Sequence, residues 1–238
     1  MEKGLQQWKN TLKPEQVADG MNAAQANALR LLEDAEILLK SKRYPAAVSL
    51  AILSIEESGK IAVFREIAMA RDGKELKEAW RSYRSHTKKN VGWGASDFVL
   101  KGARKLEDFL GMFAENAKHP EVLDNLKQVA FYTDCLGRAN WSIPEDVIDE
   151  ICANSIVEIA RLKASDKKHT QREVELWIHH LKPVWKTNIE DMKRALIKWR
   201  KAMVSEGLLE ESHVFDMFIG LETSYNKSIQ PTAKASAD

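Results

Sequence analysis

Residues 46–64 read AAVSLAILSIEESGKIAVF, and this stretch decides the fold. Its apolar residues recur at helical spacing, so we expect a long helix from about Pro45 to Ala70. Pro45 suits the first turn of this helix, where its missing N–H costs nothing. The stretch also contains two adjacent glutamates and a glycine, which an apolar helix does not need for its own stability.

The two glutamates have different interpretations. Glu56 lies one turn before Lys60, in the order that favours an ordinary surface ion pair. Glu57 is placed at the centre of the apolar stripe. On a helical wheel, five apolar residues lie within about 40° of it, namely Leu50, Leu53, Ile61, Phe64 and Ala68. A buried carboxylate needs a partner or a proton. Glu57 is therefore satisfied by a backbone group or a lysine stem, or it orients an Arg or His side chain.

Gly59 stands in the middle of the same helix. Glycine at such a position costs about 1 kcal/mol relative to alanine. This residue indicates that another helix packs closely against the chain there.

Helical patterns also cover most of the remaining chain. We expect a helix from about Ala18 to Lys40 and a third from about Lys74, ending near Gly92 and Gly94. Further helices are predicted over 95–116, from Pro120 to Leu136 and from Pro144 onward. Ser205–Gly207 is predicted to separate the preceding helix from a last one over about 208–221. Gly137 to Pro144 is predicted to be a loop. The fold class is therefore all-α.

The C-terminal third of the chain has its own pattern of apolar residues. Residues 171–204 carry a heptad-like apolar stripe that Pro183 should kink or divide. Lys and Arg residues on the other face are either a solvated surface or a track for an RNA backbone. We expect an N-terminal arm (1–17), a helical domain (18–165), a C-terminal helical extension (166–222) and a disordered tail (223–238).

The segment Trp80–Lys89 reads WRSYRSHTKK and concentrates cations and aromatic rings without an acidic residue. It is either the solvated C-terminal end of a helix, where the helix dipole favours cations, or a site for an anion. In a regular helix Arg81 and His86 would stand about 140° apart. The two side chains could then meet on one face only if the helix were distorted.

Several segments together resemble the AbiV abortive-infection family of the HEPN superfamily, over roughly residues 20–165. They are ALRLLEDA (28–35), YPAA (44–47), IEESGK (55–60), the basic segment ending in His86, and LKQVAFYTD (126–134) running into WSIP (141–144). The resemblance implies an antiparallel helical bundle. HEPN proteins are often metal-independent endoribonucleases with an Arg-x4–6-His motif, and they commonly dimerise so that two motifs line one cleft.

Carried onto this chain, the resemblance makes Arg81 and His86 the catalytic pair. Histidine titrates near neutrality and serves as acid or base, whereas arginine stays charged and holds phosphate oxygens. Supporting roles fall to Glu57, Lys60 and Arg84, and RNA-backbone contacts to Lys88 and Lys89. The expected partners are RNA (tRNA, rRNA or mRNA), a second copy of the chain and a phage-encoded activator.

Composition limits the other functions. The 238 residues have a net charge of only +1, so an anion site must be a local patch. Cys135 and Cys152 have no metal-ligand spacing, and we expect no cofactor and no metal. Without an apolar leader or membrane span, the expected location is the cytoplasm.

An alternative function is a non-catalytic protein that binds a phage protein or RNA. Ser82, which stands where HEPN motifs often carry Asn, His or Asp, favours this alternative.

Overall fold

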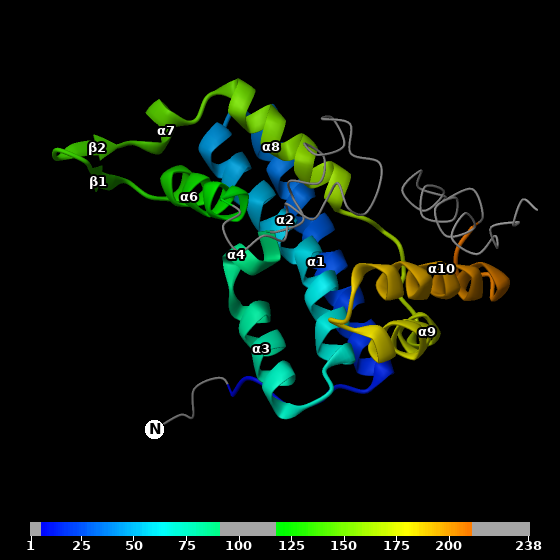
Figure 1. Ribbon diagram of the computed structural model, residues 1–238. Helices are drawn as coiled ribbons and strands as arrows, with labels where there is room; N and C mark the ends of the chain where they lie inside the picture. The colour runs from blue at the N-terminus through cyan, green and yellow to red at the C-terminus, as the bar shows by residue number, and fades with distance from the viewer. Residues whose placement is uncertain (1–5, 91–117, 211–238) are drawn as a thin grey trace, which may run out of the picture.

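The computed structural model describes residues 6–90 and 118–210, and over these ranges it confirms the all-α fold class (Figure 1). The helical segments expected over 95–116 and beyond 210 lie outside the described residues. The elements, in chain order, are α1 (Pro14–Lys40), α2 (Tyr44–Met69), α3 (Gly73–Arg84), α4 (His86–Lys89), α6 (His119–Phe131), β1 (Asp134–Leu136), β2 (Asn140–Ser142), α7 (Pro144–Val147), α8 (Glu150–Lys163), α9 (Gln171–Leu181), η3 (Lys182–Val184) and α10 (Ile189–Ser205).

Helix α2 is the centre of the bundle. It packs along α1 and also contacts α3, α4, α6, α8 and α9. Figure 1 shows α1 and α2 as the two long helices around which the others are arranged. Residues of α1, α2, α6 and α8 form the largest buried cluster, which includes Leu32, Ile52, Ile55, Leu123 and Val157. A helix covered on so many sides has no single polar face, and this affects how its glutamates are placed.

Helix α1 begins earlier than the sequence pattern predicts. It starts at Pro14 instead of about Ala18, and Val17, Ala18 and Met21 are buried. The residues before it are attached to α3, because the Trp80 indole Nε1 donates a hydrogen bond of 3.1 Å to the carbonyl of Asn10.

The third expected helix is interrupted. Asp72 caps α3 through hydrogen bonds from the backbone N–H groups of Lys74 and Glu75. The helix ends at Arg84, and Ser85 takes an extended conformation with φ −85° and ψ 127°. The short helix α4 then begins at His86. The chain therefore turns between Arg81 and His86, and the two residues do not belong to one regular helix.

The prediction of a helix from Pro120 to Leu136 is wrong at its C-terminal end. Helix α6 stops at Phe131, and the chain forms a two-stranded antiparallel hairpin in which Cys135 is opposite Trp141. Gly137 (φ 55°) and Ala139 (φ 59°) take left-handed conformations in the turn. Figure 1 shows the hairpin projecting from the bundle, away from α9 and α10.

Pro183 divides the C-terminal helical pattern as predicted. It lies in η3, between α9 and α10. Lys193 and Arg200 are buried and Lys182 donates a hydrogen bond of 2.9 Å to the carbonyl of Ala70, so these three cations do not belong to the basic face. For the exposed Lys186, Arg194, Lys198 and Lys201, both alternatives, a solvated surface and an RNA track, stay open. The division of the chain into arm, domain, extension and tail stays a prediction.

A buried polar cluster attaches α9 to the bundle. Glu173 lies 3.1 Å from Nδ1 of His169 and 3.3 Å from the Arg65 guanidinium of α2. The backbone N–H and carbonyl of His169 are paired with the side-chain amide of Asn22 on α1. Arg65 also stacks over the Trp177 ring at 4.6 Å. These contacts hold α9 against α1 and α2.

Candidate active site

Glu56 is the residue around which the candidate site is built. Only 2% of it is exposed, and it lies in the middle of α2. Its Oε2 lies 2.6 Å from Nδ1 of His86, and its Oε1 lies 2.7 Å from Nζ of Lys127. Lys89 Nζ is 4.0 Å from Oε2, and Asp124 shares Lys127 at 2.9 Å. One buried carboxylate thus joins α2 to α4 and α6.

The interpretation from the helical wheel is wrong for Glu56 and holds in one of its alternatives for Glu57. Glu56, expected to form a surface pair with Lys60, is the buried residue that holds His86. Glu57 is half-buried and accepts a hydrogen bond of 2.6 Å from Lys60, so the alternative of a lysine partner holds and the expected role of orienting Arg81 or His86 does not. The physical reason is that neighbouring helices cover α2 on several sides, so the wheel has no clear apolar face from which to choose.

Gly59 confirms the prediction of close packing. A Cβ atom at this position would lie 2.0 Å from the backbone carbonyl oxygen of Lys89 in α4. Any side chain at residue 59 would therefore push α4 away from α2. Since α4 begins with His86, the glycine lets the imidazole reach Glu56.

Lys89 is not available to an RNA backbone, which corrects the role predicted for it. It is 8% exposed and faces Glu56. Burial lowers the pKa of Lys89, and the attraction of Glu56 offsets this only in part, while Lys60 and Lys127 lower the pKa further. The residue is part of the internal charge network around Glu56.

Sequence reasoning missed Lys127. It comes from α6, far from Glu56 in the sequence, and it is 5% exposed. Burial acts to lower its pKa, but hydrogen bonds to Glu56 and Asp124 outweigh that effect and raise it. The only local signal was Asp124 three residues earlier, which fits an ordinary pair on a helix surface.

No hydrogen bond or ion pair joins Arg81, Arg84, Lys88 or Lys60 to Glu56. Arg81, Arg84 and Lys88 are exposed, and the guanidinium of Arg81 forms no hydrogen bond or ion pair with any described residue. Lys60 joins Glu57 and lies 5.2 Å from the centre of the Tyr83 ring. Their roles toward a substrate stay predictions.

The geometry at His86 is suited to proton transfer. Its Nδ1 is held on the buried carboxylate, while 56% of the side chain is exposed, so a substrate can reach the ring. A carboxylate that accepts the proton of Nδ1 favours the tautomer in which Nε2 is free to take a proton. Within residues 6–90 and 118–210, no group of His, Cys, Asp and Glu side chains is arranged to hold a metal ion.

Comparison with known families identifies the class of protein to which this helical bundle belongs. The family model described as AbiV matches residues 16–165, more than half of the chain. The chain therefore belongs to the AbiV family of HEPN abortive-infection proteins, as the resemblance indicated. No curated protein and no solved structure matches it. Among the described helices, none is long and apolar enough to cross a membrane.

Proposed function

We infer that this protein is a metal-independent endoribonuclease that acts in abortive infection, with His86 as acid and base. The observation that carries the proposal is the hydrogen bond of 2.6 Å between a buried carboxylate and an exposed histidine in a segment rich in cations. RNA cleavage without a metal needs a group to take the 2′-hydroxyl proton and one to protonate the leaving 5′-oxygen. Membership of the AbiV family supports the biological setting.

Arg81 is assigned as the phosphate clamp. Its guanidinium has no partner among the described residues, so it is available to bind phosphate oxygens through two N–H groups. Arg84 and Lys88 contribute to backbone binding, and Glu56 takes over from Glu57 the role of positioning His86. Lys60 and Glu57 support the segment through their ion pair and Tyr83.

A homodimer suits this site. One copy offers a single His86 with its network, whereas cleavage needs both an acid and a base. Two copies that face one another would supply two histidines and two arginines to one cleft. The products would then carry 2′,3′-cyclic phosphate ends.

The test is RNA cleavage by purified protein with EDTA present, alone and with lysate from phage-infected cells as a source of activator. We expect cleavage by the wild type and none by Arg81→Ala or His86→Ala, while His179→Ala, at an exposed histidine of α9, stays active. Cleavage by both site variants at the wild-type rate would reject the assignment.

A second candidate function is protein binding without catalysis. The observation in its favour is a group of exposed apolar side chains on and next to the strands of the β1–β2 hairpin, including Tyr132, Leu136 and Trp141. Such a surface is typical of protein contacts. This alternative predicts that phage resistance survives His86→Ala but is lost when the hairpin residues are changed.

A further inference from the structure

The N-terminal arm has features that the catalytic assignment does not explain. Residues 6–13 read QQWKNTLK, with two lysines, three side-chain amides, an indole and no acid. They precede the residues that match the AbiV family model. Trp8 is 57% exposed, although an indole is large and apolar. Its Nε1 donates only a local hydrogen bond of 3.4 Å to the carbonyl of Thr11.

The arm has a fixed place beside α3. The hydrogen bond from Trp80 to the carbonyl of Asn10 attaches it, and Leu12 packs against the buried cluster that contains Trp80. Two extended residues span at most about 7 Å, so Trp8 cannot lie far from this attachment point. Residues 6–10 line a hollow that is wide open to solvent.

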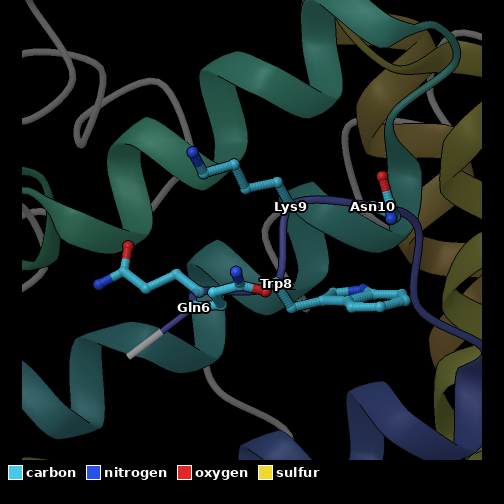
Figure 2. A pocket seen from close by; sticks show the side chains of 5 residues that line it. Gln6, Trp8, Lys9 and Asn10 are labelled. Atoms are coloured by element: carbon cyan, nitrogen blue, oxygen red, sulfur yellow. The ribbon is translucent and has the colours of Figure 1, made fainter. Parts of the chain in front are cut away.

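Side chains of different chemistry surround this hollow. Figure 2 shows Gln6 and Lys9 extending to one side of the arm and the Trp8 indole to the other. An indole offers a flat surface on which any base can stack, and amides and lysine suit base edges and phosphates.

A row of cations on α3 continues from this point toward His86. Lys77, Arg81 and Arg84 are all exposed, and their spacing of four and three residues puts them on one face of the helix. The face adjoins Trp80, which holds the arm. From Lys77 to Arg84 the helix rises by roughly 10 Å, a length that spans more than one phosphate. His86 follows directly after the end of this helix.

We propose that the arm and this face of α3 form a binding track for single-stranded RNA, in which an unpaired base stacks on Trp8. Phosphates of the same strand lie on Lys77, Arg81 and Arg84, and the strand leads to His86. Single-stranded nucleic acid is bound in this way when cations follow the backbone and aromatic rings stack on bases. This proposal extends the proposed ribonuclease function. It rests on that function in one respect, because the strand leads to His86 only if His86 is the site of cleavage.

The test measures the binding of a fluorescein-labelled, unstructured 2′-O-methyl RNA strand, which cannot be cleaved through its 2′-oxygen. We expect Trp8→Ala to weaken binding by at least about fivefold, the loss typical of one stacked base. Trp8→Phe should retain most of the affinity because it keeps a ring. Trp141→Ala, which removes an indole that is 69% exposed on the hairpin, should bind like the wild type. Lys77→Ala should reduce the dependence of affinity on salt.

The outcomes separate this track from the catalytic assignment. If His86→Ala abolishes cleavage but Trp8→Ala binds as tightly as the wild type, the ribonuclease stands and the track is wrong. If Trp8→Ala and Lys77→Ala lose binding while His86→Ala still cleaves, the track stands and the catalytic assignment is wrong. Three other results would overturn the track. The wild type could fail to bind the strand, or Trp8→Phe could lose as much affinity as Trp8→Ala. The third is that Trp8 is needed only for the capture of a phage protein.

Discussion

Glu56 Oε2 and His86 Nδ1 are 2.6 Å apart, although the two residues are separated by 30 positions and belong to different helices. The carboxylate is buried and the imidazole is largely exposed. This relationship links the core of the bundle to the surface where the substrate would bind. It fixes one nitrogen of the ring and leaves the opposite edge accessible.

Replacing Glu56 with Gln tests whether it positions His86. Under the proposed mechanism, we expect kcat to fall on the order of a hundredfold, the size typical of an impaired acid–base group, while KM changes little. The buried Lys127 keeps Asp124, so we expect a stability loss of no more than roughly 3 kcal/mol. Glu33→Gln, at an exposed glutamate of α1, is the matched control and should leave kcat unchanged. Equal effects of the two substitutions on kcat would contradict the role of Glu56.

Gly59→Ala tests the contact between α2 and α4. In an exposed helix this change stabilises by about 1 kcal/mol, but here the new Cβ would meet the Lys89 carbonyl at 2.0 Å. We expect destabilisation of roughly 1–3 kcal/mol, as in other overpacked sites, together with loss of activity, measured by urea unfolding and RNA cleavage. Gly73→Ala, where no atom lies within 4 Å of the added Cβ, should be tolerated. A stabilised and active Gly59→Ala variant would show that α4 does not need this close approach.

Lys88 and Lys89 form a matched pair for RNA binding. Lys88 is exposed, whereas Lys89 is buried against Glu56. We expect Lys88→Ala to weaken binding of the non-cleavable strand and to reduce its salt dependence. Lys89→Met should change the free energy of unfolding instead and leave binding intact. A larger loss of affinity for Lys89→Met than for Lys88→Ala would reject this division.

Acid should weaken the attachment of α9. Burial acts to raise the pKa of Glu173, but His169, Lys167 and Arg65 outweigh it and lower the pKa below the ordinary value of 4.5. A lowered pKa in the folded state stabilises the protein above pH 4.5, and this contribution is lost as the pH falls through the folded-state pKa.

The substitution Glu173→Gln checks this dependence. We expect it to reduce stability at pH 7 by roughly 3 kcal/mol, because Arg65 and His169 lose a buried partner, and to flatten the decline in acid. Thermal unfolding between pH 7 and 3 measures both effects. Glu175→Gln, at an exposed pair with Arg172, should have little effect on stability. An unchanged pH profile for Glu173→Gln would contradict the account.

The sequence predicted features that have a local cause. Gly59 was identified as a close contact because a glycine inside a helix needs a reason, and Pro183 as a division because proline cannot continue a helix. His86 was identified from the resemblance and from its cationic neighbours, and the structure gives it a buried carboxylate partner.

Features that depend on tertiary packing were not accessible. The choice between Glu56 and Glu57 depends on which helices cover α2, and the helical wheel contains no such information. The interruption at Ser85 has no proline or glycine to signal it. Lys127 joins the site only because α6 returns to α2, and its partner is 71 positions away.

The central claim is that His86, held by Glu56, cleaves RNA during infection. It is tested most directly by mapping 2′,3′-cyclic phosphate ends in total RNA from phage-infected cells that carry the wild type or His86→Ala. The account predicts new ends and phage resistance with the wild type, and loss of both with His86→Ala at equal protein level. The same ends and the same resistance in the His86→Ala cells would contradict it.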